Sequence, residues 1–233
     1  MKLRLLAAAL AALTLTAGTA SAQDTSSEKG KLSYALGYDL GRNLVESGEA
    51  IDVAAVVKAV QDGYDKKEPS VPVDQLKVAV ENMQKRQVAK AKIAFDKASA
   101  ENKTKSDAFL AQNKTKAGVT SLPSGVQYRI VEVGTGAKPT QASDVQIQYK
   151  GSLPTGQTFV DTFTPQQGQP AGPVSVKLSQ IPLVGLREAL TQMPTGSRWE
   201  VVLPPTQAYG NTPQSPIGPN QAVVFDVKLV GAK

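Results

Sequence analysis

Apolar residues recur at helical spacing through the first half of the chain. Leucines occupy every fourth position from Leu32 to Leu44, shortly after Ser27, a residue type that often caps helices. Valines follow Asp52 at similar helical spacing, and another apolar stripe follows Asp74. We therefore predict three helices, each beginning just after one of these polar residues.

The third predicted helix is too long for a small domain to cover. It meets no Pro or Gly before Gly118, so about 40 residues would span about 60 Å at 1.5 Å per residue. Residues 99–107 are polar on every side, which is typical of a helix that crosses solvent between two units. We predict a helical module over residues 23–73 and a connecting helix over residues 74–117.

After Gly118 the pattern changes to short runs of β-type residues broken by Pro and Gly, with one helical stretch at residues 183–192. Strands with a single helix predict an α+β domain with an antiparallel sheet, over residues 118–233. The predicted strands are residues 125–133, 144–151, 158–161, 174–178, 197–203 and 222–230.

The first 22 residues have the order of a secretory signal. Lys2 and Arg4 precede an apolar run, and small residues from Ala20 to Ala22 form a cleavage site. The alternative is a membrane anchor, but the run is shorter than the roughly 20 residues that a spanning helix needs. We predict a signal peptide over residues 1–22 and export to the periplasm, with outer-membrane or surface association left open.

The composition removes several classes of chemistry. The 233 residues include no Cys and no His, and 26 Lys and Arg stand against 20 Asp and Glu. Such a chain has no thiol nucleophile, no Ser-His-Asp triad, no imidazole metal cluster and no disulfide. We expect neither a metal nor another cofactor.

The basic excess is concentrated between Asp74 and Lys116. Nucleic-acid binding would need aromatic or Arg-rich contacts among these charges, and the stretch offers only Phe95 and Phe109. We interpret it as a solvated helix face and expect no nucleic-acid partner.

The helical module is too small for a comfortable core of its own, since about 70 residues rarely suffice. Gly37 and Gly41, one turn apart, each cost up to about 1 kcal/mol relative to Ala, which suggests that another backbone approaches there. The alternative is that both glycines face solvent. We predict a homodimer formed through residues 27–98.

Six segments of the second half resemble, in order, an FKBP-type peptidyl-prolyl isomerase domain: residues 122–128, 145–151, 185–190, 196–200, 208–210 and 217–227. Residues 31–41 are similar to the dimerising N-terminal module of the macrophage infectivity potentiator and FkpA branch. The resemblance implies a curved antiparallel sheet wrapped on one short helix. It also implies prolyl isomerisation and a folding-chaperone role, with proline-containing unfolded or partly folded proteins as clients.

The resemblance places the substrate proline in an apolar cup between sheet and helix. Carried over by motif, the catalytic residues are Tyr149, Phe159, Asp161, Tyr209 and Phe225, and the substrate-binding residues are Val174, Pro182, Leu183, Leu186 and Ile217. Tyr209 is expected to donate its hydroxyl to a substrate carbonyl. Macrolides of the rapamycin type would enter the same cup.

The sequence departs from the family pattern at three positions. The family commonly has adjacent Phe and Asp, whereas Val160 stands between Phe159 and Asp161. Either a β-bulge restores Asp161 to the pocket or the acid is lost. Leu186 replaces a usual Trp and Val174 a usual Phe, so we expect a wider cup with weaker macrolide binding and slower catalysis. The second hypothesis is a chaperone or adhesion module whose cup binds clients with little turnover.

Overall fold

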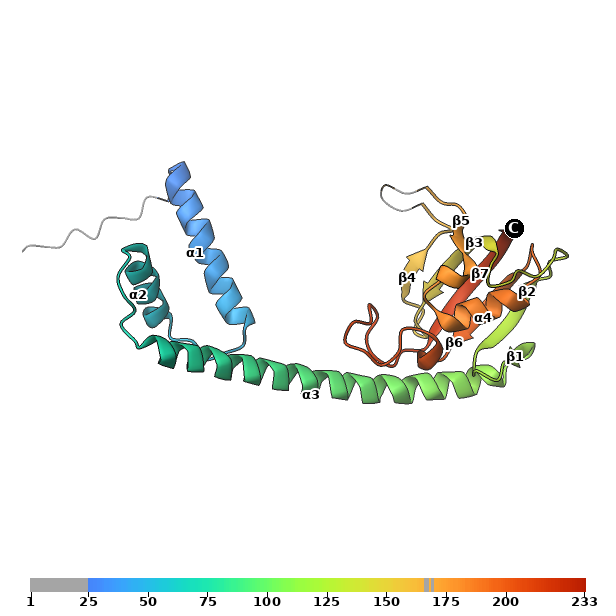
Figure 1. Ribbon diagram of the computed structural model, residues 1–233, viewed down its shortest axis with the longest axis horizontal. Helices are drawn as coiled ribbons and strands as arrows, with labels where there is room; N and C mark the ends of the chain where they lie inside the picture. The colour runs from blue at the N-terminus through green and yellow to red at the C-terminus, as the bar shows by residue number, and fades with distance from the viewer. Residues whose placement is uncertain (1–24, 166–167, 169) are drawn as a thin grey trace, which may run out of the picture. The chain divides into compact units, whose positions relative to one another are not determined.

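A computed structural model describes residues 25–165, 168 and 170–233 (Figure 1). The predicted signal peptide, residues 1–22, lies outside the described residues. The chain divides into two compact units, Met1–Met83 and Gln84–Lys233, and the helix α3 (Val73–Lys114) contributes to both. No helix among the described residues has the length and apolar character to cross a membrane.

Two predicted caps begin the short helices of the first unit. The Ser27 hydroxyl accepts a hydrogen bond from a first-turn amide of α1 (Glu28–Glu46) at 3.1 Å. A carboxylate oxygen of Asp52 accepts one from the Ala54 amide of α2 (Val53–Tyr64) at 2.9 Å. Each bond satisfies a backbone donor that the helix itself leaves without a partner, which explains why the helices begin there.

The long helix begins before its predicted cap, Asp74. Helix α3 starts at Val73, so Asp74 lies in its first turn and is not the cap. The Pro72 carbonyl instead accepts hydrogen bonds from the Gln75 and Leu76 amides, at 2.9 and 3.2 Å. Asp74 still suits this place, because a carboxylate near a helix N-terminus interacts favourably with the helix dipole.

The described part of the first unit, residues 25–83, has no buried core in a single chain. Neither α1 nor α2 contains a buried residue, and Leu32 and Leu36 of the predicted stripe are 62% and 65% exposed. Gly37 and Gly41 have open space where a side chain would stand. The apolar face predicted from the sequence is therefore present and uncovered.

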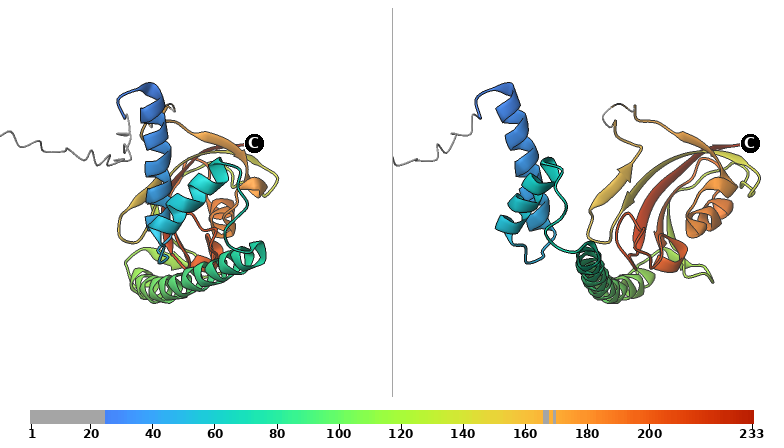
Figure 2. Two further views of the ribbon diagram at one scale, coloured as in Figure 1. Left: turned by 90° about the vertical axis from the view of Figure 1, so that its left-hand side faces the viewer. Right: turned by 60° about the vertical axis from the view of Figure 1, so that its left-hand side comes forward.

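The second unit is an antiparallel sheet with one helix on its inner face (Figure 2). The strand order is β1-β2-β6-β7-β3-β4, with β5 also paired to β3. The strands are β1 (Val119–Ser121), β2 (Gln127–Glu132), β3 (Asp144–Ser152), β4 (Thr158–Asp161), β5 (Val174–Lys177), β6 (Arg198–Leu203) and β7 (Val223–Ala232), and the helix is α4 (Val184–Gln192). The predicted α+β class is confirmed, and only β1 was missed.

Alternation along β7 separates the two faces of the sheet. Phe225, Val227 and Leu229 are buried in the core with α4, whereas Asp226 and Lys228 between them are partly exposed on the outer face. Successive side chains of a strand point to opposite faces of the sheet. This alternation therefore decides which residues of each strand can face a site beside α4.

The polar stretch of α3 does not cross solvent as predicted. Ser106 is 1% exposed and Asn113 2% exposed, both within the second unit. The Ser106 hydroxyl donates to the Asn220 carbonyl at 2.9 Å, and the Asn113 side-chain amide donates to the Gln127 side-chain oxygen at 2.9 Å. These polar side chains have partners within the second unit, which a helical-face pattern alone does not reveal.

Candidate active site

An apolar pocket of about 230 Å³ lies between the sheet and the segment that leads into α4. Its walls are Ile147, Tyr149, Val160, Val174, Val176, Gln180, Ile181, Pro182, Leu183, Leu186, Tyr209 and Phe225. Pockets for drug-sized ligands are about 300–1,000 Å³. This smaller pocket suits a single side chain, held among mostly apolar walls with few polar groups.

The structure brings most of the predicted site residues to this pocket. The predicted residues that line it are Tyr149, Val174, Pro182, Leu183, Leu186, Tyr209 and Phe225. Sequence reasoning missed the lining residues Ile147, Val160, Val176, Gln180 and Ile181. Two of these could have been predicted from the sequence. Ile147 and Val176 each stand two positions from a predicted residue on the same strand, so they share its face.

A β-bulge resolves the irregular spacing around Val160. Lys150 pairs with Asp161 and Gly151 with Val160, but the next pair is Ser152 with Thr158. Phe159 is therefore the extra residue of β4. Val160, opposite the inward-facing Gly151, becomes the pocket wall, whereas Phe159 is not among the lining residues.

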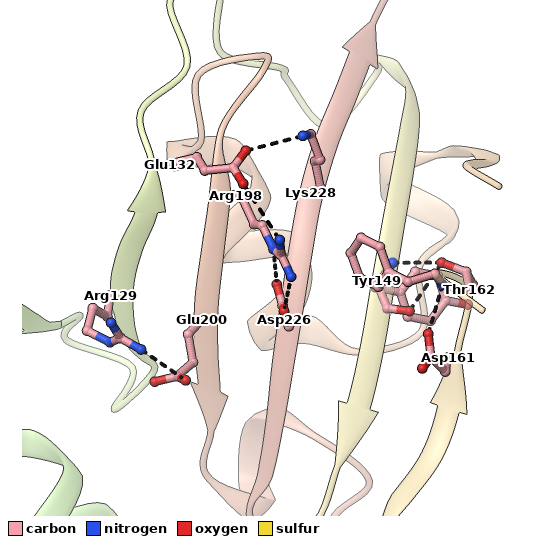
Figure 3. A network of polar contacts seen from close by, with 10 residues as sticks. Arg129, Glu132, Tyr149, Asp161, Thr162, Arg198, Glu200, Asp226 and Lys228 are labelled. Carbon is pink, nitrogen blue, oxygen red and sulfur yellow. Dashed lines mark hydrogen bonds and ion pairs between the residues drawn. The ribbon is translucent and has the colours of Figure 1, made fainter. Parts of the chain in front are cut away.

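Asp161 is placed at the end of β4 and outside the pocket lining. One carboxylate oxygen accepts a hydrogen bond from the Phe163 amide at 2.8 Å. Between them, Thr162 continues the pairing with β3: its hydroxyl accepts from the Tyr149 amide at 2.8 Å and its amide donates to the Tyr149 carbonyl at 2.9 Å (Figure 3). Asp161 thus shapes a turn that is fastened to a pocket residue.

The two other predicted residues outside the lining pack near it. The Phe159 ring meets Tyr209 and Phe225 edge to face, with centroids 6.0 and 5.9 Å apart. Ile217 is partly buried and packs against the core. Edge-to-face contacts of this kind fix ring orientation, so Phe159 supports the pocket walls from behind.

Tyr209 supplies a hydroxyl in a largely apolar setting. Burial raises the pKa of Tyr209, and the neighbouring Tyr149 adds to the rise. The residue follows the short 3-10 helix Pro205–Gln207, and Gly210 next to it has φ +75 with its amide bonded to the Pro205 carbonyl at 2.9 Å. The phenol therefore remains a neutral hydrogen-bond donor at physiological pH.

Comparison with known proteins identifies the family. Residues 29–130 match the domain amino terminal to FKBP-type peptidyl-prolyl isomerase, and residues 135–230 match FKBP-type peptidyl-prolyl cis-trans isomerase. The "Outer membrane protein MIP" of Legionella longbeachae is 40% identical over 238 residues, covering 100% of this chain and 99% of that protein. The chain belongs to the FKBP-type peptidyl-prolyl isomerase family.

Further relatives place this FKBP within one branch. The "Peptidyl-prolyl cis-trans isomerase Mip" of Coxiella burnetii is 32% identical over 88% of this chain and 87% of that protein. The crystal structure of FkpA from Escherichia coli matches with a TM-score of 0.66 and 28% identity, over 89% of this chain and 98% of that one. The resemblance to the Mip and FkpA branch is thereby confirmed.

The segment entering α4 gives this FKBP a fixed rim. The Ile181 amide donates to the Leu178 carbonyl at 3.2 Å, and an Arg187 guanidinium nitrogen donates to the Ile181 carbonyl at 2.6 Å. Pro182 restricts the backbone between these bonds and Leu183. The rim of the pocket is held on both sides of Ile181 before any ligand arrives.

Proposed function

We propose that the pocket between the sheet and α4 binds the proline ring of an Xaa-Pro bond and accelerates its rotation in client proteins. The supporting observation is the small apolar pocket with the neutral Tyr209 hydroxyl among its walls. No nucleophile or metal is required, because the reaction makes and breaks no covalent bond.

The physical basis is stabilisation of the twisted bond. Rotation about a peptide bond meets a barrier of about 18–20 kcal/mol because resonance must be broken. The twisted amide is less charge-separated than the planar one, so walls such as Leu186 and Phe225 that exclude water favour it. Interactions formed only with the twisted bond lower the barrier, whereas those shared with the planar substrate do not.

Separate roles follow for the polar groups. Tyr209 donates a hydrogen bond to a substrate carbonyl, and backbone groups of Pro182 and Leu183 bind the flanking peptide. Asp161 accepts a hydrogen bond from the ligand at the edge of β4 while holding the turn that pairs with Tyr149. Ile217 and Phe159 complete the apolar surroundings. We therefore assign two sets of residues. The proposed catalytic residues are Tyr149, Phe159, Asp161, Tyr209 and Phe225, and the proposed substrate-binding residues are Val174, Pro182, Leu183, Leu186 and Ile217.

The chaperone role rests on a homodimer formed through residues 27–98. The exposed stripe of α1, with Leu32 at 62% and Leu36 at 65%, is supported as an interface by the open space at Gly37 and Gly41. A second copy would cover it. Two pockets in one assembly raise the effective concentration of one domain for a client bound to the other.

Export and macrolide binding complete the proposal. Residues 1–22 form the signal peptide, and the mature chain acts in the periplasm or at the outer membrane, where the name of the Legionella relative places that protein. Rapamycin-type macrolides compete for the pocket with low affinity, because a pocket of about 230 Å³ leaves most of a large ligand outside.

The experiment is cis-to-trans relaxation of a Leu-Pro peptide with the purified mature protein, with and without rapamycin. Acceleration that rapamycin suppresses is expected. A folded protein that binds proline peptides without accelerating them would instead favour the chaperone or adhesion module. Tyr209→Phe separates the two functions further, since client protection would survive while acceleration falls.

A further inference from the structure

Asn220 closes the loop that follows Tyr209. Its backbone amide donates to the Gly210 carbonyl at 3.0 Å, which joins the end of the loop to the residue directly after Tyr209. The φ of Asn220 is +52, a left-handed conformation that costs energy in a residue other than Gly. Asn adopts this conformation more readily than other non-Gly residues, and contacts from outside the loop add to its stability.

Helix α3 holds Asn220 by both its side chain and its backbone. The Asn220 side-chain amide donates to the Ser99 hydroxyl at 2.8 Å. The buried Ser106 hydroxyl donates to the Asn220 carbonyl at 2.9 Å and accepts from the Ala222 amide at 2.8 Å. One hydroxyl thus satisfies two backbone groups of the loop just before β7 begins.

Two further contacts extend this attachment along the helix. The Asn102 side-chain amide donates to the Pro219 carbonyl at 2.9 Å, and the Ser99 hydroxyl donates to the Asn211 side chain at 2.9 Å. Ser99, Asn102 and Ser106 are spaced by three and four residues, so they lie on one face of α3. We name these three residues the α3 polar row.

We propose that the α3 polar row, acting through Asn220, positions Tyr209 for catalysis. The inference rests on the proposed role of Tyr209 as hydrogen-bond donor. The row touches neither the pocket nor the substrate: its members bind the loop, Asn220 binds Gly210, and Gly210 directly follows Tyr209. A hydrogen bond used only at the twisted state demands accurate placement, and a 1 Å error can cost about 100-fold in rate.

This arrangement gives the connecting helix a part in catalysis beyond that of a spacer. Without the row, the hydrogen bonds found for the loop between Tyr209 and β7 would all be local, among them the one from the Gly218 amide to the Ser215 carbonyl at 3.3 Å, and Ile217 would still pack against the core. The loop contains Pro and Gly at several positions and no helix or strand longer than a turn. The row therefore supplies the hydrogen bonds that tie this loop to α3.

The test compares two variants that both break the hydrogen bond between the Asn220 side chain and the Ser99 hydroxyl. Ser99→Ala also removes the bond from that hydroxyl to Asn211. Asn220→Gly deletes the side chain but permits the positive φ, and Ser99→Ala deletes the hydroxyl that the side chain binds. Thr104→Ala is the matched control, because among the described residues the Thr104 hydroxyl bonds only to the Ala100 carbonyl of its own helix. Ser99→Thr restores a hydroxyl and serves as the rescue variant.

The measurements are kcat and KM for a Leu-Pro peptide and the melting temperature of each full-length variant. We expect Asn220→Gly and Ser99→Ala to lower kcat by about fivefold with little change in KM. The double variant should lose less than the sum of the two single variants, because both break the contact between Ser99 and Asn220. Thr104→Ala and Ser99→Thr should match the wild type.

Each other outcome overturns the inference. Unchanged kcat in both variants, with an active wild type, would show that the row does not position Tyr209. Loss of kcat in step with melting temperature, without rescue by Ser99→Thr, would show a purely structural contact. An inactive wild type would instead refute the proposed function itself, which keeps the two failures distinguishable.

Discussion

Gly151 on β3 lies directly against the ring of Phe159 on β4, with no room for a side chain between them. A Cβ on Gly151 would come within 2.8 Å of two ring carbons of Phe159 and of one of Phe225. The close approach explains how the bulge accommodates an extra aromatic residue, because Phe159 fills the space that any other residue at position 151 would occupy.

Gly151→Ala should therefore damage the pocket more than a single methyl group suggests. The rings of Phe159 and Phe225 must move, and overpacking of this kind costs about 1–3 kcal/mol. We expect a lower melting temperature and a loss of most isomerase activity, because Phe225 lines the pocket. Gly172→Ala is the control, since no atom of the described residues lies within 4 Å of its added Cβ.

A smaller and more flexible side chain at position 159 should relieve that damage. In the double variant Gly151→Ala with Phe159→Leu, the methyl group has a more adaptable neighbour, so stability should recover in part. Additive losses in this double variant, measured by thermal unfolding, would show that Gly151 matters for some reason other than Phe159.

Tyr209→Phe tests the hydroxyl alone. The variant keeps the ring contacts with Phe159, and the loss of one neutral hydrogen bond should lower kcat by about threefold to tenfold. Melting temperature should stay near that of the wild type, because the hydroxyl lies in a ligand pocket. A variant with full activity would remove Tyr209 from the mechanism.

The pH dependence follows from the raised pKa of Tyr209. Burial makes the folded protein hold this proton more tightly than the unfolded chain, so the stabilisation is complete below a pH of about 10 and is lost as pH rises through the higher folded pKa. The chain has no His, so no type of side chain in it has an ordinary pKa between about 5 and 8. Isomerase rates should be flat from about pH 6 to 9. A bell-shaped profile centred near neutrality would contradict this assignment.

The sequence predicted the architecture well but the details of the site less well. Strand alternation and the caps at Ser27 and Asp52 are local signals, so the fold class, the helices and most strands could be read from them. The choice between a bulge and a lost acid at Val160 depends on pairing with Gly151, and pairing register is a tertiary property.

The missed residues show the same limit. Gln180 and Ile181 line the pocket from an irregular segment that has no periodicity to extrapolate. Ser106 was interpreted as solvated because a polar residue on a polar helix usually is, yet its partner Asn220 lies 114 positions away. Only the folded chain reveals which polar side chains have such distant partners.

Val174→Phe should strengthen macrolide binding. Val174 is 41% exposed and lines the pocket, so an aromatic ring at this position can cover more of the ligand without entering the core. An added aromatic contact of about 1 kcal/mol would lower the rapamycin Kd by about fivefold in calorimetry. Val184→Phe, also at an exposed position but outside the lining, should leave the Kd unchanged. Equal gains in both variants would indicate nonspecific adsorption.

Arg198 gathers the charges of the outer sheet face. Its guanidinium donates to both carboxylate oxygens of Asp226, at 2.8 and 2.7 Å, and approaches Glu132 at 3.6 Å (Figure 3). The ring of Phe163 lies 5.2 Å away, on the turn that follows β4. The hydrogen bond to Asp226 is the main reason that the pKa of Arg198 is raised.

Arg198→Lys should lower stability without lowering catalysis. Lysine keeps the charge but loses the paired bonds and the planar contact with Phe163. Because Arg198 and Asp226 are both 34% exposed, solvent screening limits the loss to about 1 kcal/mol, or about 2–4 °C in melting temperature. The kcat should stay within about twofold, since Asp226 and the pocket residue Phe225 point to opposite faces of β7.

Lys228→Met is the control for this prediction. It removes a single contact to Glu132 at 3.2 Å and should lower the melting temperature less. A larger loss in Lys228→Met than in Arg198→Lys would show that net charge, and not the paired geometry at Arg198, stabilises this face.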